Sequence, residues 1–451
     1  MMAAAFAPFV DKAPLCVMSR LTLENLFSPK RLDVLFKNTA ERQYEKELLF
    51  SQVSELMMSV VLRVNPTVHA AYRQRADILP VSDQAIYDKL QCMELGVSAA
   101  LVADSASHLA PVIDLLGARL PAWLPGYRVR VIDGNHLSAS ERRIKELRQT
   151  WAAGLPGKVL AVYEQELDLV TQVFLTPDGH AQERSLLDDV LTSVRADDLW
   201  IADRNFCTQK FLLDIAAAQG FFAIRQHGQL QGELLGKRRS RGSTPTGKLY
   251  EQRLRLQLGE RTLEVRRVTL LLDQPTRDGE TEIHVLTNLP KEIHAAKVAE
   301  LYQKRWTIEG RFYQVTQTLN CEPNTLGYPK AALFAFCLAL VASNAVALMK
   351  ASLRAVHDAD DVANMSHHYM AEEVRQTYIG MMVALPPSRW LRYRNLSAAE
   401  LAAVLRHVAS HVRPAFYRKA KRGPKKPATA KGKYKIGGHA STHKLLLKRK
   451  E

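Results

Sequence analysis

Three acidic side chains in this sequence could together hold metal ions. Asp133 and Asp203 each end an apolar run, RVRVID and DLWIAD, and Glu309 lies in the segment LYQKRWTIEGRFYQV. Carboxylates without Cys or His form an all-oxygen site of the kind that Mg²⁺ prefers. Such a site can hold two divalent ions about 3.5–4 Å apart and clamp both the attacking and the leaving oxygen of a phosphoryl transfer.

Each carboxylate also has an ordinary structural explanation. Asp133 precedes Gly134, and Asp-Gly is a common turn. Asp203 follows a run typical of a strand, where an aspartate often caps the next element. Glu309 stands four residues after Arg305, a spacing at which surface ion pairs form on helices. Both interpretations stay open for each residue taken singly.

The segment 301–315 is predicted to be one helix, and its side chains favour a functional role. At about 100° per residue, its apolar residues form one stripe. Tyr302, Arg305, Trp306 and Glu309 gather on one face directly beside that stripe. Trp306 is open to two interpretations, a base-stacking surface or a core aromatic.

The elements around these residues predict an α/β fold. Runs typical of strands occur at 128–133, 158–170, 171–177, 198–203 and 221–226, with helical patterns at 181–194 and 208–219. This order suits a mixed sheet with helices on its faces. Because the carboxyl ends of strands carry the sites of open sheets, Asp133 and Asp203 are well placed. Between them and Glu309 come the basic loop GELLGKRRSRGSTPTGK and three strand-like runs.

The chain divides into six predicted segments. They are a helical N-terminal domain over 1–120 that either binds DNA or is a structural cap, a catalytic core over 125–227, a β-rich insertion over 228–293, the last part of the core over 294–350, a helical region over 351–412 and a basic tail over 413–451. Ser82 is predicted to cap a helix that starts at Asp83. The uncharged run 331–349 is long enough to span a membrane, but we expect a buried core helix.

Charge is concentrated in the tail. The net charge is +16, and residues 413–451, with 14 Lys/Arg and one acid, hold +13 of it. A segment so poor in apolar residues is expected to be disordered when free and to bind phosphate backbones. A solubilising role is the alternative. The five cysteines form no CxxC pair and the N-terminus is a poor signal peptide, so we expect a cytoplasmic, nucleoid-associated protein.

The motifs together resemble those of DDE-type transposases from bacterial insertion sequences. The resemblance is to the group with a Tyr-x2-Arg-x3-Glu-x6-Lys signature, insertion sequence family four, and Tyr302, Arg305 and Glu309 have its spacing. VIDGN resembles the first-aspartate motif and IADRNF the second. The signature lysine is replaced by Thr316, for which Lys330 or the basic loop is a candidate substitute.

The resemblance implies a ribonuclease-H-like fold and a Mg²⁺-dependent enzyme using two ions, with Mn²⁺ as a substitute. Asp133, Asp203 and Glu309 would hold the ions. The enzyme would cut transposon ends and join the freed 3′ hydroxyl to target DNA. Double-stranded DNA is the expected partner, bound by a homodimer without any membrane. DNA contacts would come from one set of side chains: Tyr302, Arg305, Trp306, Lys237, Arg238, Arg239 and Arg241. A ribonuclease-H-like nuclease, such as a junction resolvase, and an inactive DNA-binding relative are the alternatives. His136 and His180 are expected to be structural or surface residues.

Overall fold

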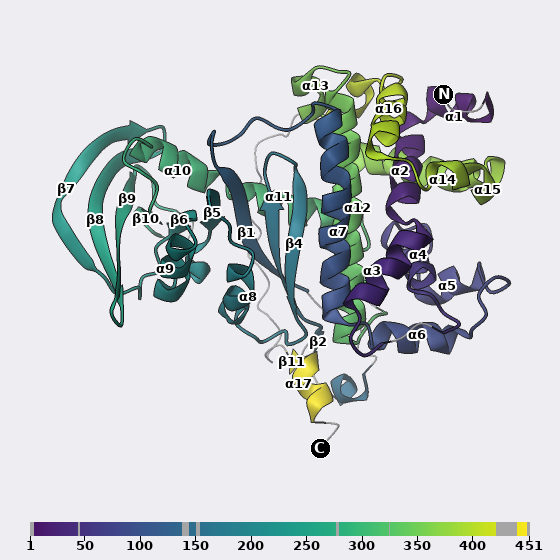
Figure 1. The fold of residues 1–451 in the computed structure, drawn as a ribbon, viewed down its shortest axis with the longest axis horizontal. Helices are drawn as coiled ribbons and strands as arrows, with labels where there is room; N and C mark the ends of the chain where they lie inside the picture. The colour runs from purple at the N-terminus through teal and green to yellow at the C-terminus, as the bar shows by residue number, and fades with distance from the viewer. Residues whose placement is uncertain are drawn as a thin grey trace.

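A mixed β-sheet extends from the left end of the molecule to its centre, where it meets the long helices (Figure 1). The computed structural model describes residues 4–43, 46–137, 144–149, 154–276, 279–323, 325–420 and 440–448, and only the backbone at 311, 313, 314, 317 and 440. Within these residues the sheet has nine strands in the order β4-β3-β1-β5-β6-β10-β9-β8-β7. Their bounds are β1 Arg128–His136, β3 Lys158–Glu164, β4 Leu169–Thr176, β5 Asp198–Ala202, β6 Phe221–Arg225, β7 Glu233–Thr244, β8 Gly247–Leu258, β9 Arg261–Leu272 and β10 Glu282–Thr287.

The strands of the sheet run in both directions. β1, β5 and β6 are parallel, whereas β3 pairs antiparallel with both β1 and β4. From β6 onward, β10, β9, β8 and β7 add antiparallel pairs. The prediction of a mixed sheet flanked by helices is therefore confirmed, and the β-rich insertion extends that same sheet.

Both faces of the central strands are buried. Alternate residues of the central strands point to opposite sides, because side chains alternate along a strand. Val131 and Ile201 belong to a core shared with the long helices, whereas Ile132 and Trp200 belong to a second core. Helices α8 Leu187–Leu191 and α9 Gln209–Ala217 supply the second core. Helix α10 Ala295–Gln303 packs against β5 to β10.

The helical part of the molecule combines both ends of the chain. Its helices pack around α12 Pro329–Arg354, which runs beside α7 (Figure 1). The N-terminal helices are α1 Ala7–Lys12, α2 Pro14–Leu26, α3 Pro29–Thr39, α4 Phe50–Val61, α5 Val68–Arg73, α6 Asp83–Gln91 and α7 Leu95–Leu115. The C-terminal helices are α13 Ala359–Ala363, α14 His367–Ala384, α15 Pro387–Trp390 and α16 Ala398–Ala409. One hydrophobic core contains residues from Phe6 to Val412, and the predicted domain boundaries stay a prediction.

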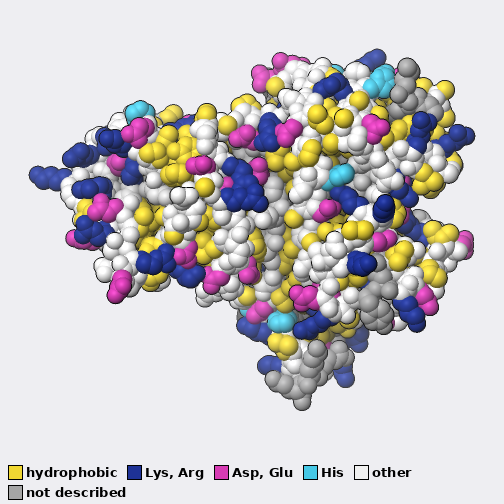
Figure 2. All heavy atoms as spheres, in the orientation of Figure 1, with side chains coloured by type: hydrophobic (Ala, Val, Ile, Leu, Met, Phe, Trp, Pro, Cys, Tyr) yellow, Lys and Arg dark blue, Asp and Glu magenta, His cyan; other side chains and the backbone are white. Residues whose placement is uncertain are grey.

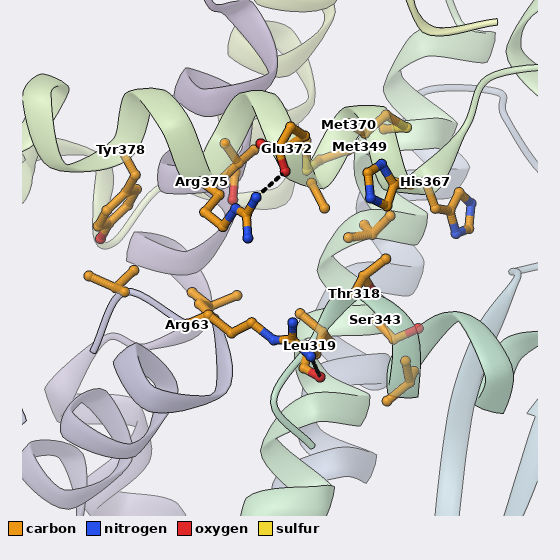
Figure 3. A pocket seen from close by; sticks show the side chains of 18 residues that line it. Arg63, Thr318, Leu319, Ser343, Met349, His367, Met370, Glu372, Arg375 and Tyr378 are labelled. Carbon is orange, nitrogen blue, oxygen red and sulfur yellow. Dashed lines mark hydrogen bonds and ion pairs between the residues drawn. The ribbon is translucent and has the colours of Figure 1, made fainter. Parts of the chain in front are cut away.

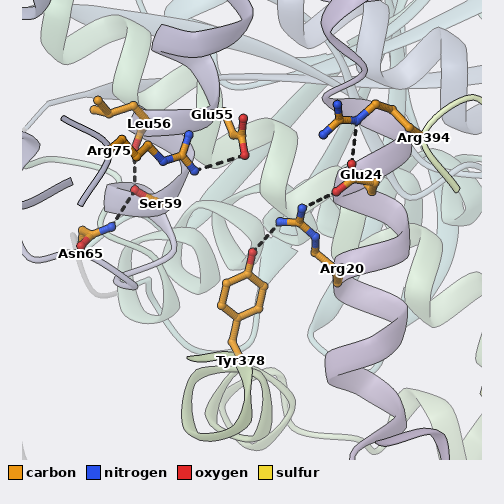
Figure 4. A network of polar contacts seen from close by, with 9 residues as sticks. All are labelled: Arg20, Glu24, Glu55, Leu56, Ser59, Asn65, Arg75, Tyr378 and Arg394. Carbon is orange, nitrogen blue, oxygen red and sulfur yellow. Dashed lines mark hydrogen bonds and ion pairs between the residues drawn. The ribbon is translucent and has the colours of Figure 1, made fainter. Parts of the chain in front are cut away.

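A buried polar network links the N-terminal and C-terminal helices (Figure 4). The Arg20 guanidinium of α2 donates to the Tyr378 hydroxyl of α14 at 2.7 Å and to Glu24. Glu24 also accepts a hydrogen bond from Arg394 at 2.7 Å. Because each charge inside the network meets an opposite charge, burial of these groups is tolerated.

Helix α12 is the core helix predicted from its uncharged run. α7 and α12 are both long and apolar enough to cross a membrane by composition, and 94% of the apolar window of α12 is buried inside the protein. Asn344 on α12 is buried, and its side chain bonds the Val170 N–H and C=O at 2.9 Å each and the Ser105 hydroxyl at 3.1 Å. α12 therefore holds edge strand β4 and helix α7 together.

Several local predictions hold and others fail. Ser82 caps α6 by accepting a hydrogen bond from Ala85. The apolar residues of 40–64 are spaced as in one helix, but α4 begins only at Phe50, so a helix over the whole segment is wrong in its first part. The turn expected after residue 170 falls at 165–168 instead, where Asp168 adopts a left-handed conformation with φ 61°.

The prediction of a basic loop is also wrong, because most of its residues form strand β7 at the edge of the sheet. Gly and, to a lesser degree, Lys are poor strand formers, but the backbone of β7 pairs with β8. The pairing shifts register between Leu235 and Arg239 and again between Ser240 and Ser243. Tertiary pairing has therefore overridden local propensity here.

Part of the basic tail has a defined structure. β11 Ala440–Ser441 pairs in parallel with β2 Gly154–Leu155, and α17 Thr442–Leu447 follows it. Asp178 anchors the segment 440–448. Its carboxylate accepts a hydrogen bond from Ser441 and forms an ion pair with Lys444 at 3.4 Å. The expected disorder thus does not extend to 440–448. Residues 421–439, the centre of that prediction, lie outside the described residues.

Candidate active site

The two aspartates lie at the same level on neighbouring parallel strands. The pairing of β1 with β5 ends at Val131 and Ile201, and Asp133 and Asp203 each follow two residues later. Because side chains alternate, both aspartates share the sheet face of Val131 and Ile201. Asp133 does not end its strand as predicted, since β1 continues to His136 beside β3. The Asp-Gly turn interpretation is therefore wrong. Asp203 does cap a short 3₁₀ turn, by accepting the Arg204 N–H.

The segment predicted as one helix is two helices. α10 ends at Gln303 and α11 Trp306–Thr318 begins three residues later, so Tyr302 and Glu309 lie on different helices. The turn between them is tightened by hydrogen bonds from Arg305 N–H to Tyr302 C=O and from Ile308 N–H to Arg305 C=O. The break separates the residues that a single helical wheel places together. It lets α10 follow the sheet while α11 packs against β1.

Arg305 joins the first aspartate to the glutamate. Its Nη1 donates to Asp133 Oδ2 at 2.9 Å, and its Nη2 donates to Glu309 Oε1 at 2.7 Å. The Arg305 side chain is only 6% exposed, whereas that of Glu309 is 37% exposed. The guanidinium therefore lies between two carboxylates that are 176 positions apart in the chain.

The electrostatics place Asp203 in the same group. Burial raises the pKa of Asp133 to about 6, and the carboxylates of Glu309 and Asp203 add to the rise, against the lowering effect of Arg305 and the Gly134 N–H. Burial lowers the pKa of Arg305, but attraction to Asp133, Asp203 and Glu309 more than offsets this and leaves it raised. All three acids therefore act on one guanidinium, which stays charged.

The donor set fits a hard divalent cation. The oxygens come from carboxylates, and three carboxylates with one guanidinium carry a net charge of about −2 when all are ionised. Within the described ranges, however, no three His, Cys, Asp or Glu side chains are close enough to hold one ion. The guanidinium of Arg305 between Asp133 and Glu309 accounts for part of this spacing.

A cluster of ion pairs beside the strand end that carries Asp203 was not predicted from the sequence. Arg225 ends β6, and it is level with Asp203 because Ala202 pairs with Ile224. Arg225 forms an ion pair with Glu280, whose carboxylate also accepts from Arg204 at 3.0 Å. The position of Arg225 at the end of FFAIR, the next parallel strand, was the signal that could have identified it.

Tyr302 points into this arrangement instead of toward solvent. It is 7% exposed, and it lies close enough to Arg225 to contribute to the raised pKa of that guanidinium. Burial raises the pKa of Tyr302, and the charge of Asp203 adds to the rise. In this conformation Tyr302 cannot make the predicted contact with a DNA backbone, because its ring is buried.

Trp306 lies on the surface beside the candidate site. It is 65% exposed, which excludes the core-aromatic interpretation, and Arg305 lies 5.6 Å from its ring centroid. Thr316 is on the same helix, half-buried. Lys330, considered as a substitute for the missing lysine, lies near Glu94, whose pKa is lowered by three backbone N–H groups, with a smaller contribution from Lys330.

The basic side chains of β7 form a mixed surface. Figure 2 shows Lys and Arg side chains interspersed with Asp and Glu over the end of the molecule that β7–β9 form in Figure 1. Arg238 forms an ion pair with Glu282 and lies 4.1 Å from the Tyr250 ring centroid, and Arg241 pairs with Glu251. Lys237 and Arg239 are exposed and form no ion pair within the described part of the chain.

The carboxylates do not lie in the pocket shown in Figure 3. That pocket is lined by Val315, Thr318 and Leu319 at the end of α11, and by α14 residues including Arg375. It begins about 9 Å along the helix axis from Glu309. The candidate site is therefore separate from this pocket. His136 and His180 are exposed, as expected.

Comparison with known proteins identifies a transposase domain in the part of the chain that contains these residues. Residues 124–345, just under half of the chain, match the family model described as "Transposase DDE domain". This match supports a DDE-type transposase, and the family implies a metal-dependent enzyme that cuts and joins DNA. No curated protein matches the sequence. Among solved structures, the chain is similar to a piggyBac transposase synaptic complex with hairpin DNA, with a TM-score of 0.39 and 10% identity over 85% of this chain and 84% of that one.

Proposed function

We propose, from the transposase DDE domain at 124–345 and the carboxylates within it, that the protein is a DNA transposase of an insertion sequence. It would cut the ends of its element by two-metal phosphoryl transfer and join the freed 3′ hydroxyl to target DNA. The observation that carries the proposal is the level placement of Asp133 and Asp203, with Glu309 linked to Asp133 through Arg305.

A ribonuclease-H-like core is part of the proposal. It is supported by the order β4-β3-β1-β5-β6, with β1, β5 and β6 parallel and β3 antiparallel to its neighbours. In such a sheet the ends of β1 and β5 lie side by side, which is where the two aspartates stand.

Asp133, Asp203 and Glu309 are the residues that would hold Mg²⁺, for which Mn²⁺ can substitute. Bound there, the ions would activate the attacking oxygen and stabilise the leaving one. Arg305 supplies a planar fork suited to a phosphate. Arg225 is a second cation at the same edge, where it forms an ion pair with Glu280.

Double-stranded DNA is the proposed partner, in the cytoplasm at the nucleoid. Two ends of the element must be brought together for joining, so we propose a homodimer on DNA. Trp306, Lys237, Arg238, Arg239 and Arg241 are proposed DNA contacts, supported by their exposure. The tail contributes salt-dependent attraction to the phosphate backbone.

A cleavage assay with Glu309→Gln tests the proposal. The substrate is DNA that carries the sequences flanking this gene, with Mg²⁺ or Mn²⁺, and Glu300→Gln on α10 is the matched control. We expect wild type and Glu300→Gln to cut and join, and Glu309→Gln to bind DNA without cutting. Cutting without joining would indicate a nuclease, and binding without cutting by wild type would indicate an inactive relative.

A further inference from the structure

Arg305 occupies a position that a cation would otherwise fill. Its two terminal nitrogens bond Asp133 and Glu309, and the residue is 5% exposed. A phosphate cannot approach the fork in this conformation, because both outer nitrogens are already bonded and buried. The same group therefore cannot bind DNA and hold the two carboxylates at once.

Charge explains why the guanidinium is held there. Without it, the Asp133 and Glu309 carboxylates would have no cation between them, with the negative charge of Asp203 nearby, and neighbouring like charges destabilise a site. The Nε–H of Arg305 is buried and has no hydrogen-bond partner within the described part of the chain. Burial of the side chain thus leaves one hydrogen bond unmade, which favours an alternative position for it.

We propose that the Arg305 guanidinium takes the place of a metal ion in the free protein and moves away when divalent ions bind the site. In the free protein it holds Asp133 and Glu309. When divalent ions bind these carboxylates, Arg305 leaves them and its fork becomes available to a DNA phosphate. Ion binding and DNA binding then favour each other, because each one requires the released Arg305. This inference rests on the proposed function.

The exchange predicts a measurable coupling. By linkage, DNA must tighten ion binding by the same factor by which ions tighten DNA binding. For the full-length protein we expect a factor of about fivefold or more. Free Mn²⁺, measured by electron paramagnetic resonance with and without a DNA duplex, gives this factor for wild type without any variant. A factor of one in wild type would overturn the inference.

Variants identify the residue responsible. Arg305→Met removes the charge at similar length, and we expect it to bind Mn²⁺ more tightly than wild type without DNA and to lose the coupling. Arg305→Lys keeps the charge but cannot span both carboxylates, so it is expected to fall between the two and replaces Arg305→Met if that variant does not fold. Lys304→Met, which removes a neighbouring cation bonded to Glu300, should behave like wild type.

The Mn²⁺ measurements distinguish a failure of the proposed metal site from a failure of the proposed exchange of Arg305. If Glu309→Gln binds Mn²⁺ as well as wild type does, the proposed metal site itself is wrong. If Glu309→Gln loses Mn²⁺ but Arg305→Met and Arg305→Lys both keep the wild-type affinity and coupling, only the exchange of Arg305 is overturned.

Discussion

Arg305 Nη1 donates to Asp133 Oδ2 at 2.9 Å, across 172 positions of sequence. This bond fixes the start of α11 against the middle of β1. Because Glu309 is one helical turn further along α11, its carboxylate reaches the other side of the same guanidinium. The two bonds of Arg305 therefore bring the motif of Asp133 and the motif of Glu309 together in one site.

The affinity of the site for metal is expected to depend on pH. The pKa of Asp133 is raised from 3.8 to about 6, chiefly by burial, and a carboxyl must lose its proton to bind a metal. Affinity for Mn²⁺ without DNA should therefore fall up to about tenfold per unit below pH 6 and level off above it. Titration of Mn²⁺ between pH 4.5 and 8 checks this, and a fall that begins only near pH 4 would contradict it.

The same shift has a consequence for stability. Because the folded pKa of Asp133 lies above the unfolded one, the native state binds the extra proton between about pH 4 and 6. The contribution of Asp133 to stability is therefore lost as pH rises through this window. The Tm of Asp133→Asn relative to that of wild type should therefore rise as pH increases from 4 to 6. An equal slope for both proteins would count against the buried, raised carboxyl.

Asn344→Leu should destabilise the fold strongly. The substitution leaves the Val170 N–H and C=O buried without their partners, and each such group costs about 1–3 kcal/mol. We expect a loss of about 2–5 kcal/mol in the free energy of unfolding, measured with urea. Ser343→Ala, the neighbouring position, is the control and should lose less than about 1 kcal/mol. Equal losses in the two variants would contradict the role of Asn344.

Trp306→Ala should weaken DNA binding without lowering the stability of the fold. At 65% exposure the ring contributes little to the core, so Tm should stay close to that of wild type. Affinity for DNA with an unpaired end should fall by about 1–3 kcal/mol, the value of one base stacked on an aromatic ring. Fluorescence anisotropy with paired and unpaired ends measures this. A loss of Tm without a loss of affinity would assign Trp306 a structural role instead.

The basic tail should contribute to the salt dependence of DNA binding. A deletion from residue 413 would also remove the Tyr417 hydroxyl, which donates to Glu373 of α14, and would confuse binding with folding. Replacing the Lys and Arg of 421–439 by Gln avoids this. The slope of log K against log salt should become shallower by about 0.9 for each phosphate that the tail no longer neutralises. An unchanged slope would remove this segment from the DNA interface.

The sequence predicted the elements whose signals are local. RVRVID and DLWIAD are strands because apolar and β-branched residues dominate them, and Ser82 caps its helix through its own side chain. The order of the elements was enough to predict a mixed sheet. The uncharged run in α12 was identified as core because its composition resembles that of a buried helix.

Features that depend on distant partners were not predictable. The break between Gln303 and Trp306 has no proline or glycine to mark it, and it follows from packing α10 and α11 on different strands. Strand β7 forms because β8 pairs with it, despite its Gly residues. Arg305 was expected to bind phosphate, but its bond to Asp133 requires the fold.

The convergence of Asp133, Asp203 and Glu309 is tested most directly by iron-mediated cleavage of the polypeptide. Fe²⁺ bound in place of Mg²⁺, with ascorbate and peroxide, generates radicals that cut the backbone close to the ion. We predict cuts near residues 133, 203 and 309 in the same sample, all suppressed by excess Mg²⁺ and by Glu309→Gln. Cuts near only one of these positions, or cuts that Mg²⁺ does not suppress, would contradict a shared site.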